Sequence, residues 1–148
     1  MERGGSVTEY ETLTVLQPWA SALIYGPKRV ENRMWQPNSP LLQKARTLIG
    51  QRIAIHAGKQ WYSGMEPAHK SSIHPLGAVL GTMRLDAVIP KDIRRDGLVL
   101  NHLKWTLSHS WAEADSNVWL VLADPQPFDK PIPTRGQQGW WKWKGGAK

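Results

Sequence analysis

The chain has 148 residues, of which 41% are hydrophobic and 21% charged, and it contains no cysteine. This length predicts a single domain with one hydrophobic core, and the lack of cysteine excludes a disulfide framework and thiol chemistry. The formal net charge of +7 favours polyanionic partners, and solubility is the alternative explanation for this charge. No apolar run approaches the roughly 20 residues of a membrane-spanning helix.

The expected domain covers residues 10–144, with flexible ends over residues 1–9 and 145–148. The N-terminus lacks the apolar centre of a signal peptide. We therefore expect a cytoplasmic protein of a prokaryote or phage that has no membrane partner.

The first elements predicted along the chain are a strand, a helix and a second strand. Residues 12–16 are β-branched and apolar, as in a strand. Pro18 suits the first turn of a helix, where its missing N–H is not needed, and Gly26 suits the helix end. Residues 30–35 are predicted to form the second strand.

Three charged side chains gather at this second strand. Residues two apart on a strand share a face, so Glu31 and Arg33 point the same way. Lys28, in the preceding turn, can reach the same region. The cluster is either a structural ion-pair network or a functional site, and its position after a helix–glycine turn favours a functional site.

The rest of the chain is predicted to be mostly strands. A helix is expected to follow Ser39 and end at Gly50, and a strand over 52–56 is expected to turn Ile53 and Ile55 to the core. Next come a loop over 60–75, with a helical turn around 66–71, and a strand over 77–89 with a bulge at Gly81. A helix around 98–107, a strand over 118–123 with Trp119 in the core, and an extended edge over 126–133 complete the chain. Strands do not alternate regularly with helices, which argues against a doubly wound parallel sheet. The predicted fold class is mainly β with flanking helices (α+β).

Nine tryptophans against one phenylalanine are unusual, and tryptophan suits stacking on nucleic acid bases. Near the C-terminus, the tryptophans Trp140, Trp141 and Trp143 alternate with the lysines Lys142 and Lys144. This segment is either a nucleic-acid-binding edge, made by the last two tryptophans and the two lysines, or a last barrel strand whose faces the lysines guard.

Several common catalytic motifs are missing from the sequence. There is no phosphate loop, no dinucleotide-binding glycine pattern and no serine hydrolase elbow. The five histidines, at positions 56, 69, 74, 102 and 109, lack the paired spacing of zinc sites. We therefore expect no metal and no cofactor.

Residues 18–33 resemble the signature of the activating signal cointegrator homology (ASCH) superfamily, because Pro-Trp-Ala-Ser is followed by Gly-x-Lys-x-x-Glu-Asn-Arg. Later segments, at 53–59, 77–82, 119–125 and 131–143, are similar to its remaining strands and closing segment, in the same order. The resemblance implies a small PUA-like β-barrel that acts on RNA, nucleosides or DNA. Relatives include amidohydrolases of N4-acylated cytidine, ribonucleases and nucleic-acid-binding domains.

The resemblance also implies a role for Lys28, which lies where the relatives keep a catalytic lysine. In the similar amidohydrolases that lysine is paired with a threonine three residues later and with a more distant glutamate. Here the third residue is Glu31, so a threonine nucleophile is missing. Amide hydrolysis needs an activated nucleophile, a stabilised oxyanion and a proton for the leaving amine. Either Glu31 activates water while Lys28 stabilises the oxyanion, or Lys28 is the base that acts on water or on Ser21.

Several further side chains are candidates for substrate binding. Trp19 and Trp35 suit stacking on a pyrimidine, although core packing is the alternative for Trp19. Asn32 can read a base edge or cap a local turn, and His56 can bind a phosphate or serve a structural role. The full set is Trp19, Ser21, Asn32, Arg33, Trp35, His56 and Lys59.

The sequence thus predicts a small hydrolase that removes the acyl group from N4-acylated cytidine or a related modified nucleoside, with RNA as a further partner. The alternatives are a non-catalytic module that binds RNA or single strands and a ribonuclease that uses the same pocket. The basic charge favours a polymer, because a free nucleoside carries no phosphate.

Overall fold

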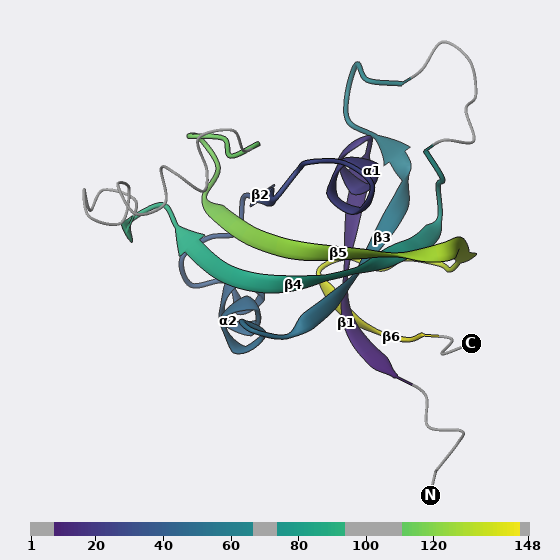
Figure 1. Ribbon diagram of the computed structural model, residues 1–148. Coiled ribbons are helices and arrows are strands. Elements are labelled where there is room, and N and C mark those ends of the chain that lie inside the picture. The colour runs from purple at the N-terminus through teal and green to yellow at the C-terminus, as the bar shows by residue number, and fades with distance from the viewer. Residues whose placement is uncertain (1–7, 67–73, 94–110, 146–148) are drawn as a thin grey trace, which may run out of the picture.

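Six strands form one strongly curled sheet in the computed structural model, which describes residues 8–66, 74–93 and 111–145 (Figure 1). The strands are β1 (Glu9–Gln17), β2 (Val30–Arg33), β3 (Arg52–Trp61), β4 (Ala78–Pro90), β5 (Val118–Pro133) and β6 (Trp140–Lys144), and the helices are α1 (Trp19–Ile24) and α2 (Pro40–Thr47). The order across the sheet is β2-β5-β4-β3-β1-β6. The predicted class, mainly β with flanking helices, is confirmed.

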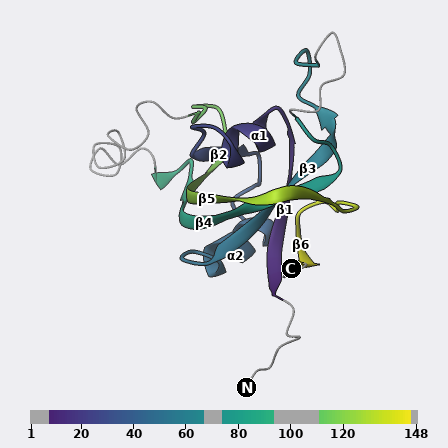
Figure 2. The ribbon, with the colours of Figure 1, turned by 45° about the vertical axis from the view of Figure 1, so that its right-hand side comes forward.

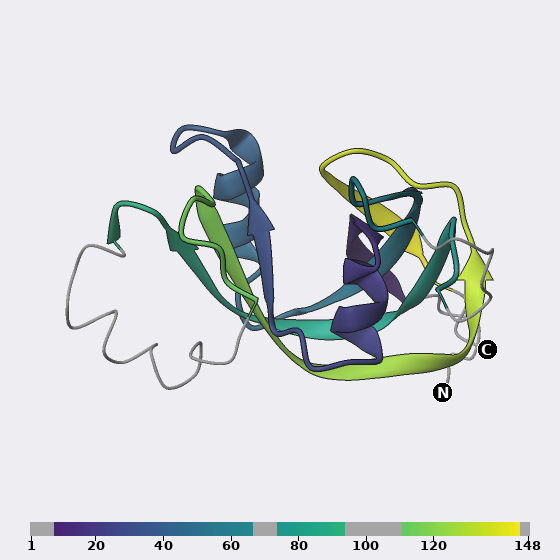
Figure 3. The ribbon, with the colours of Figure 1, turned by 90° about the horizontal axis from the view of Figure 1, so that it is seen from above.

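The sheet curls into a half-barrel (Figures 2 and 3). β2 and β6 are the two ends of the strand order. Viewed from above, α1 lies inside the curl, where it packs against β1, β3, β4 and β5 (Figure 3). The small barrel expected from the sequence takes this half-barrel form.

The two longest strands, β4 and β5, bend because their pairing is irregular. Their antiparallel register shifts at three places, and the first shift lies next to Gly81, where the sequence predicts a bulge. A Cβ at Gly81 would lie 2.4 Å from the carbonyl oxygen of Gln126, so a larger residue would push β5 away. This close crossing lets the long strands wrap around the core.

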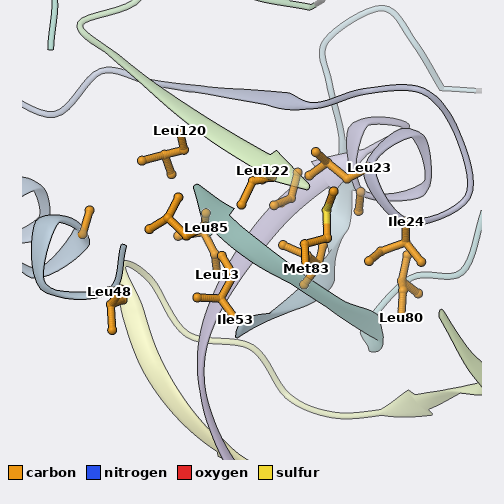
Figure 4. Close-up of a cluster of buried hydrophobic side chains, with 14 of the residues drawn as sticks. Leu13, Leu23, Ile24, Leu48, Ile53, Leu80, Met83, Leu85, Leu120 and Leu122 are labelled. Atoms are coloured by element: carbon orange, nitrogen blue, oxygen red, sulfur yellow. The ribbon is translucent and has the colours of Figure 1, made fainter. Parts of the chain in front are cut away.

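The main core lies between the sheet and the two helices (Figure 4). Period-two alternation places Ile53 and Ile55 of β3 in this core, as predicted, together with Leu120 and Leu122 of β5. Each such buried aliphatic side chain contributes about 1.5–3 kcal/mol relative to its exposed state. The opposite face of β3 carries a smaller cluster of Ala54, Val79, Trp141 and Trp143.

The predicted helix after Ser39 is α2. The Ser39 hydroxyl accepts a hydrogen bond from the backbone N–H of Leu41 at 3.1 Å, which caps the helix start, and Pro40 occupies the first turn. Gly50 follows the helix with a φ of +91°, a conformation that glycine adopts readily. Leu42 is buried against the core, whereas Ile49, which belongs to the predicted apolar spacing, is exposed because it lies past the helix end.

Two strand ends differ from the prediction. β3 continues to Trp61, well past residue 56, because its parallel pairing with β1 extends to Gln17. It therefore takes the first two residues of the predicted loop. β2 ends at Arg33, two residues early.

The prediction that Trp119 belongs to the core was wrong. Its neighbours Val118 and Leu120 are fully buried, so the alternation along β5 turns Trp119 to the other face, where it is half-buried. There its indole N–H donates to the carbonyl oxygen of Glu113 at 2.8 Å.

Some predictions fall outside the described residues. These are the helix around 98–107, most of the turn around 66–71, and the terminal segments 1–7 and 146–148. Glu9, which the sequence assigns to the N-terminal segment, is the first residue of β1. Within the described ranges, no helix is long and apolar enough to cross a membrane.

Candidate active site

A pocket of about 300 Å³ opens where β1, α1 and β2 meet. Its lining combines aromatic rings with two cations and two carboxylates. The lining residues are Thr14, Leu16, Trp19, Lys28, Glu31, Asn32, Arg33, Met34, Tyr62, Trp111 and Glu113.

Lys28 is a buried cation in this pocket, with a relative exposure of 3%. Its ammonium donates to the carbonyl oxygen of Val30 at 2.5 Å and lies 3.6 Å from Oε1 of Glu31. The rings of Trp19 and Trp111 lie 5.6 and 5.8 Å from Nζ, within cation–π range. Burial lowers the pKa of Lys28 below its ordinary value, although the Glu31 charge opposes the shift.

Glu31 lies between two cations, as the spacing on β2 predicts. Its Oε1 faces Lys28, and its Oε2 lies 3.0 Å from Nη2 of Arg33. The same Arg33 nitrogen donates to the carbonyl oxygen of Thr14 at 2.9 Å. The three charges that the sequence groups together therefore do meet, and their network is tied to β1.

Asn32 holds one wall of the pocket. Its amide NH₂ donates to the carbonyl oxygen of Trp111 at 2.8 Å, and its Oδ1 accepts from the backbone N–H of Glu113 at 2.8 Å. Asn32 therefore caps no local turn, as one of its two predicted roles required, but fixes a backbone segment about 80 residues away in the sequence. The fixed segment places Trp111 edge-on to Trp19, with ring centroids 5.4 Å apart, and Trp19 also meets Tyr62 at 5.5 Å.

Sequence reasoning missed Trp111, Glu113 and Tyr62. The first two lie about 80 residues from Asn32 along the chain. No spacing rule connects them to Lys28. The hydrogen bonds of Asn32 hold the Trp111–Glu113 segment at the pocket, and the backbone N–H of Tyr62 donates to the carbonyl oxygen of Gln17.

Two other predicted residues lie away from the pocket lining. Ser21 is buried on α1, where its hydroxyl accepts from Nε2 of Gln17 at 2.9 Å. Trp35 packs against Trp140, with ring centroids 5.9 Å apart, and lines a different hollow near Pro90. Trp19 both lines the pocket and packs against the core, so its two predicted roles coexist.

His56 and Lys59 line a second hollow next to the pocket. His56 is buried, and both ring nitrogens have partners: Nε2 lies 2.6 Å from the carbonyl oxygen of Thr134, and Nδ1 lies 3.2 Å from Oγ1 of Thr14. Burial lowers the pKa of His56. These contacts correspond to the structural role considered for this histidine.

The C-terminal tryptophan–lysine segment forms β6, which is antiparallel to β1. Trp141 and Trp143 are buried, while Lys142 and Lys144 are exposed on the opposite face. Trp143 stacks with Tyr10 at a centroid distance of 6.2 Å. The arrangement is that of a last strand guarded by lysines, and burial leaves little of either indole for stacking on a base.

A metal site is not evident in the described part of the chain, where no group of three or more histidine, aspartate or glutamate side chains is placed to hold an ion.

The fold is similar to crystal structures of ASCH from Zymomonas mobilis. One of them shares 17% sequence identity, covers 82% of this chain and 71% of its own, and has a TM-score of 0.47. A serine-to-alanine mutant of the same protein shares 19% identity, with 82% and 72% coverage and a TM-score of 0.46. A tyrosine-to-phenylalanine mutant shares 18% identity, with 82% and 73% coverage and a TM-score of 0.47. No family model and no curated protein matches the chain.

Proposed function

We propose that this protein is a small amidohydrolase that removes the acyl group from N4-acylated cytidine or a related modified nucleoside. The observation that carries the proposal is the buried Lys28–Glu31 pair in a pocket with aromatic walls. A pocket of about 300 Å³ in which a few polar groups converge among rings is typical of a small-molecule site.

The proposed reaction uses one water molecule. Glu31 takes a proton from the water, whose oxygen attacks the acyl carbon, and the carbonyl electrons move onto the acyl oxygen. The ammonium of Lys28 stabilises this oxyanion, and such electrostatic stabilisation is strongest in a site shielded from bulk water. The oxyanion electrons then re-form the carbonyl, the carbon–nitrogen bond breaks to release the carboxylic acid, and the Glu31 carboxyl returns its proton to the leaving amine.

Arg33 supports this scheme by holding the carboxylate of Glu31. Its Nη2 lies 3.0 Å from Oε2 and is itself anchored on the backbone of Thr14. Oε1 lies 3.6 Å from Lys28, and because a carboxylate oxygen has two lone pairs, it can also accept from a water. A fixed orientation of the Glu31 carboxylate raises the reaction rate, because the attacking water must approach the acyl carbon in a narrow range of geometries.

The aromatic residues supply the proposed recognition of the base. Trp19, Trp111 and Tyr62 line the pocket, and Trp19 meets the other two rings edge-on. A planar pyrimidine can stack on aromatic rings of this kind, because every base has a π-face.

The test is incubation of the pure protein with N4-acetylcytidine, followed by ultraviolet absorbance. Cytidine should form in proportion to protein concentration. The Glu11→Gln variant is a matched control, because Glu11 pairs with Lys44 at 3.1 Å outside the pocket, and it should retain full activity. Absence of cytidine above the protein-free rate would contradict the proposal.

The net charge of +7 favours a second candidate function, the binding or cleavage of RNA through the same pocket. A labelled single-stranded RNA is incubated with the protein in parallel. Cleavage products without deacylation would favour a ribonuclease, and a stable complex without either reaction would favour a binding module.

A further inference from the structure

A second hollow, of about 310 Å³, lies directly beside the pocket. Thr14 and Leu16 line both cavities, so the end of β1 forms a ridge between them, and Leu16 is exposed there. β3 runs past both cavities as well, because Lys59 lines the hollow while Tyr62, just after the strand, lines the pocket. A ligand in the pocket can therefore extend across Leu16 into the hollow.

The two cavities differ in charge. The pocket is lined by two cations and two carboxylates, whose formal charges cancel. The hollow is lined by Lys59 and Arg135, with no carboxylate among its described residues. Both side chains are exposed, and neither forms an ion pair with a carboxylate in the described ranges. A neutral base suits the pocket, whereas an anion suits the hollow.

Further donors surround these two cations. Gln60, Gln137 and Gln138 line the same hollow, and each amide carries an NH₂ group. The stem of Lys59 lies against Gly77, where a Cβ would come 3.3 Å from Cε of the lysine. Gly77 has a φ of +66°, so the backbone there is suited to glycine and leaves room for the lysine stem.

We propose that the hollow is a phosphate site, which holds the phosphate of a nucleotide whose base occupies the pocket. This inference rests on the proposed function for the identity of the base, and it names the substrate class as a phosphorylated nucleoside. Lys59 and Arg135 donate charge-assisted hydrogen bonds to the phosphate oxygens. Leu16 packs against the sugar between the two cavities.

The experiment is isothermal titration calorimetry with cytidine, cytidine 5′-monophosphate and cytidine 3′-monophosphate, at about 0.15 M salt so that weak surface attraction is screened. At least one monophosphate should bind about tenfold more tightly than cytidine, a difference of about 1.4 kcal/mol. In the Lys59→Gln, Arg135→Gln double variant this ratio should fall to about one. A short single strand with a central cytidine tests whether a phosphodiester depends on the same two residues.

The control is Arg46→Gln, which removes one exposed charge on α2, away from both cavities, and should keep the preference. Circular dichroism checks that the double variant folds. The Lys59→Gln and Arg135→Gln single variants should each lose part of the preference for a monophosphate over cytidine. Equal binding of cytidine and both monophosphates, or an unchanged ratio in the double variant, would overturn the phosphate site. If N4-acetylcytidine is not deacylated but the phosphate preference depends on Lys59 and Arg135, the phosphate site stands and the hydrolase proposal fails.

Discussion

Arg33 of β2 donates to the carbonyl oxygen of Thr14 of β1 at 2.9 Å, although these two strands are not neighbours in the sheet. The same guanidinium nitrogen lies 3.0 Å from Glu31. One side chain therefore bridges two pocket-lining strands that the sheet itself does not pair.

This link makes Arg33→Lys an informative change. Lysine keeps the charge but cannot reproduce the planar fork, so we expect the loss of one hydrogen bond and a fall of about 1–3 kcal/mol in the free energy of unfolding, measured with urea. The control is Arg84→Lys, which affects an exposed pair with Asp86 and should leave the unfolding midpoint unchanged. Equal stability of Arg33→Lys and the wild type would show that the link to Thr14 adds nothing to folding.

Lys28 is best replaced by methionine, because it is buried against two indole rings rather than exposed in its turn. Lys28→Met keeps the volume and removes the charge, so turnover of N4-acetylcytidine should fall at least about a hundredfold, as for a lost oxyanion donor. Lys28→Ala should lose the same activity and also unfold at lower urea concentration, because it leaves a cavity. Near-normal turnover in Lys28→Met would remove this residue from the mechanism.

The pH profile provides a separate test of Lys28. Because burial lowers its pKa, the ammonium loses its proton below the ordinary lysine range. Oxyanion stabilisation requires the charged form, so the hydrolysis rate should decline on the alkaline side with an apparent pKa below 10.5. A rate that rises through this range would assign Lys28 the role of base, and a constant rate would show that its charge does not contribute to turnover.

Glu31→Gln should reduce turnover at least about a hundredfold, the usual size of a lost general-base contribution. The amide keeps the shape of the side chain, so substrate affinity should change much less than kcat. The kinetic constants are compared with those of Glu11→Gln, whose carboxylate also pairs with a lysine. Wild-type rates in Glu31→Gln would contradict its role as base.

Asn32→Ala tests whether a fixed wall matters. The variant loses two hydrogen bonds to the backbone of Trp111 and Glu113, each worth about 0.5–1.5 kcal/mol. We expect KM to rise several-fold, with a changed near-ultraviolet circular dichroism spectrum because Trp111 no longer packs in place. Gln51→Ala, which loses a hydrogen bond to the carbonyl oxygen of Thr47 away from the pocket, should change neither quantity.

His56 should make stability depend on mildly acidic pH. Its pKa is lowered in the folded chain, so as pH falls below about 6.5 the unfolded chain takes up a proton that the folded chain does not. The free energy of unfolding should therefore fall between about pH 7 and pH 5. In His56→Gln, this part of the pH slope should disappear, whatever its stability at neutral pH. An identical slope in both proteins would exclude His56 as the cause.

The charged half of the site was predictable because a strand fixes side-chain parity over short distances. Once residues 30–33 form β2, Glu31 and Arg33 must share a face, and Lys28 in the preceding turn is close enough in sequence to reach them. The aromatic half was not predictable, since Trp111 reaches the pocket only through contacts made after the chain has folded.

The burial of individual tryptophans was also beyond the sequence pattern. Alternation states that Trp119 and Leu120 face opposite ways, but it does not say which face the core occupies. The same holds for Trp141 and Trp143, whose face of β6 is covered by Tyr10 of β1 and Phe128 of β5, both far from β6 in the sequence.

β2 carries Glu31, the proposed base, and has a strand neighbour on one side only, β5, along four paired residues from Val30 to Arg33. An edge strand of this length gains less cooperative protection than the strands inside the sheet. Its amide protons should therefore exchange with solvent sooner than those of β3 and β4, through local opening rather than global unfolding. The proposed base then lies on a segment that can detach and re-form while the core remains folded.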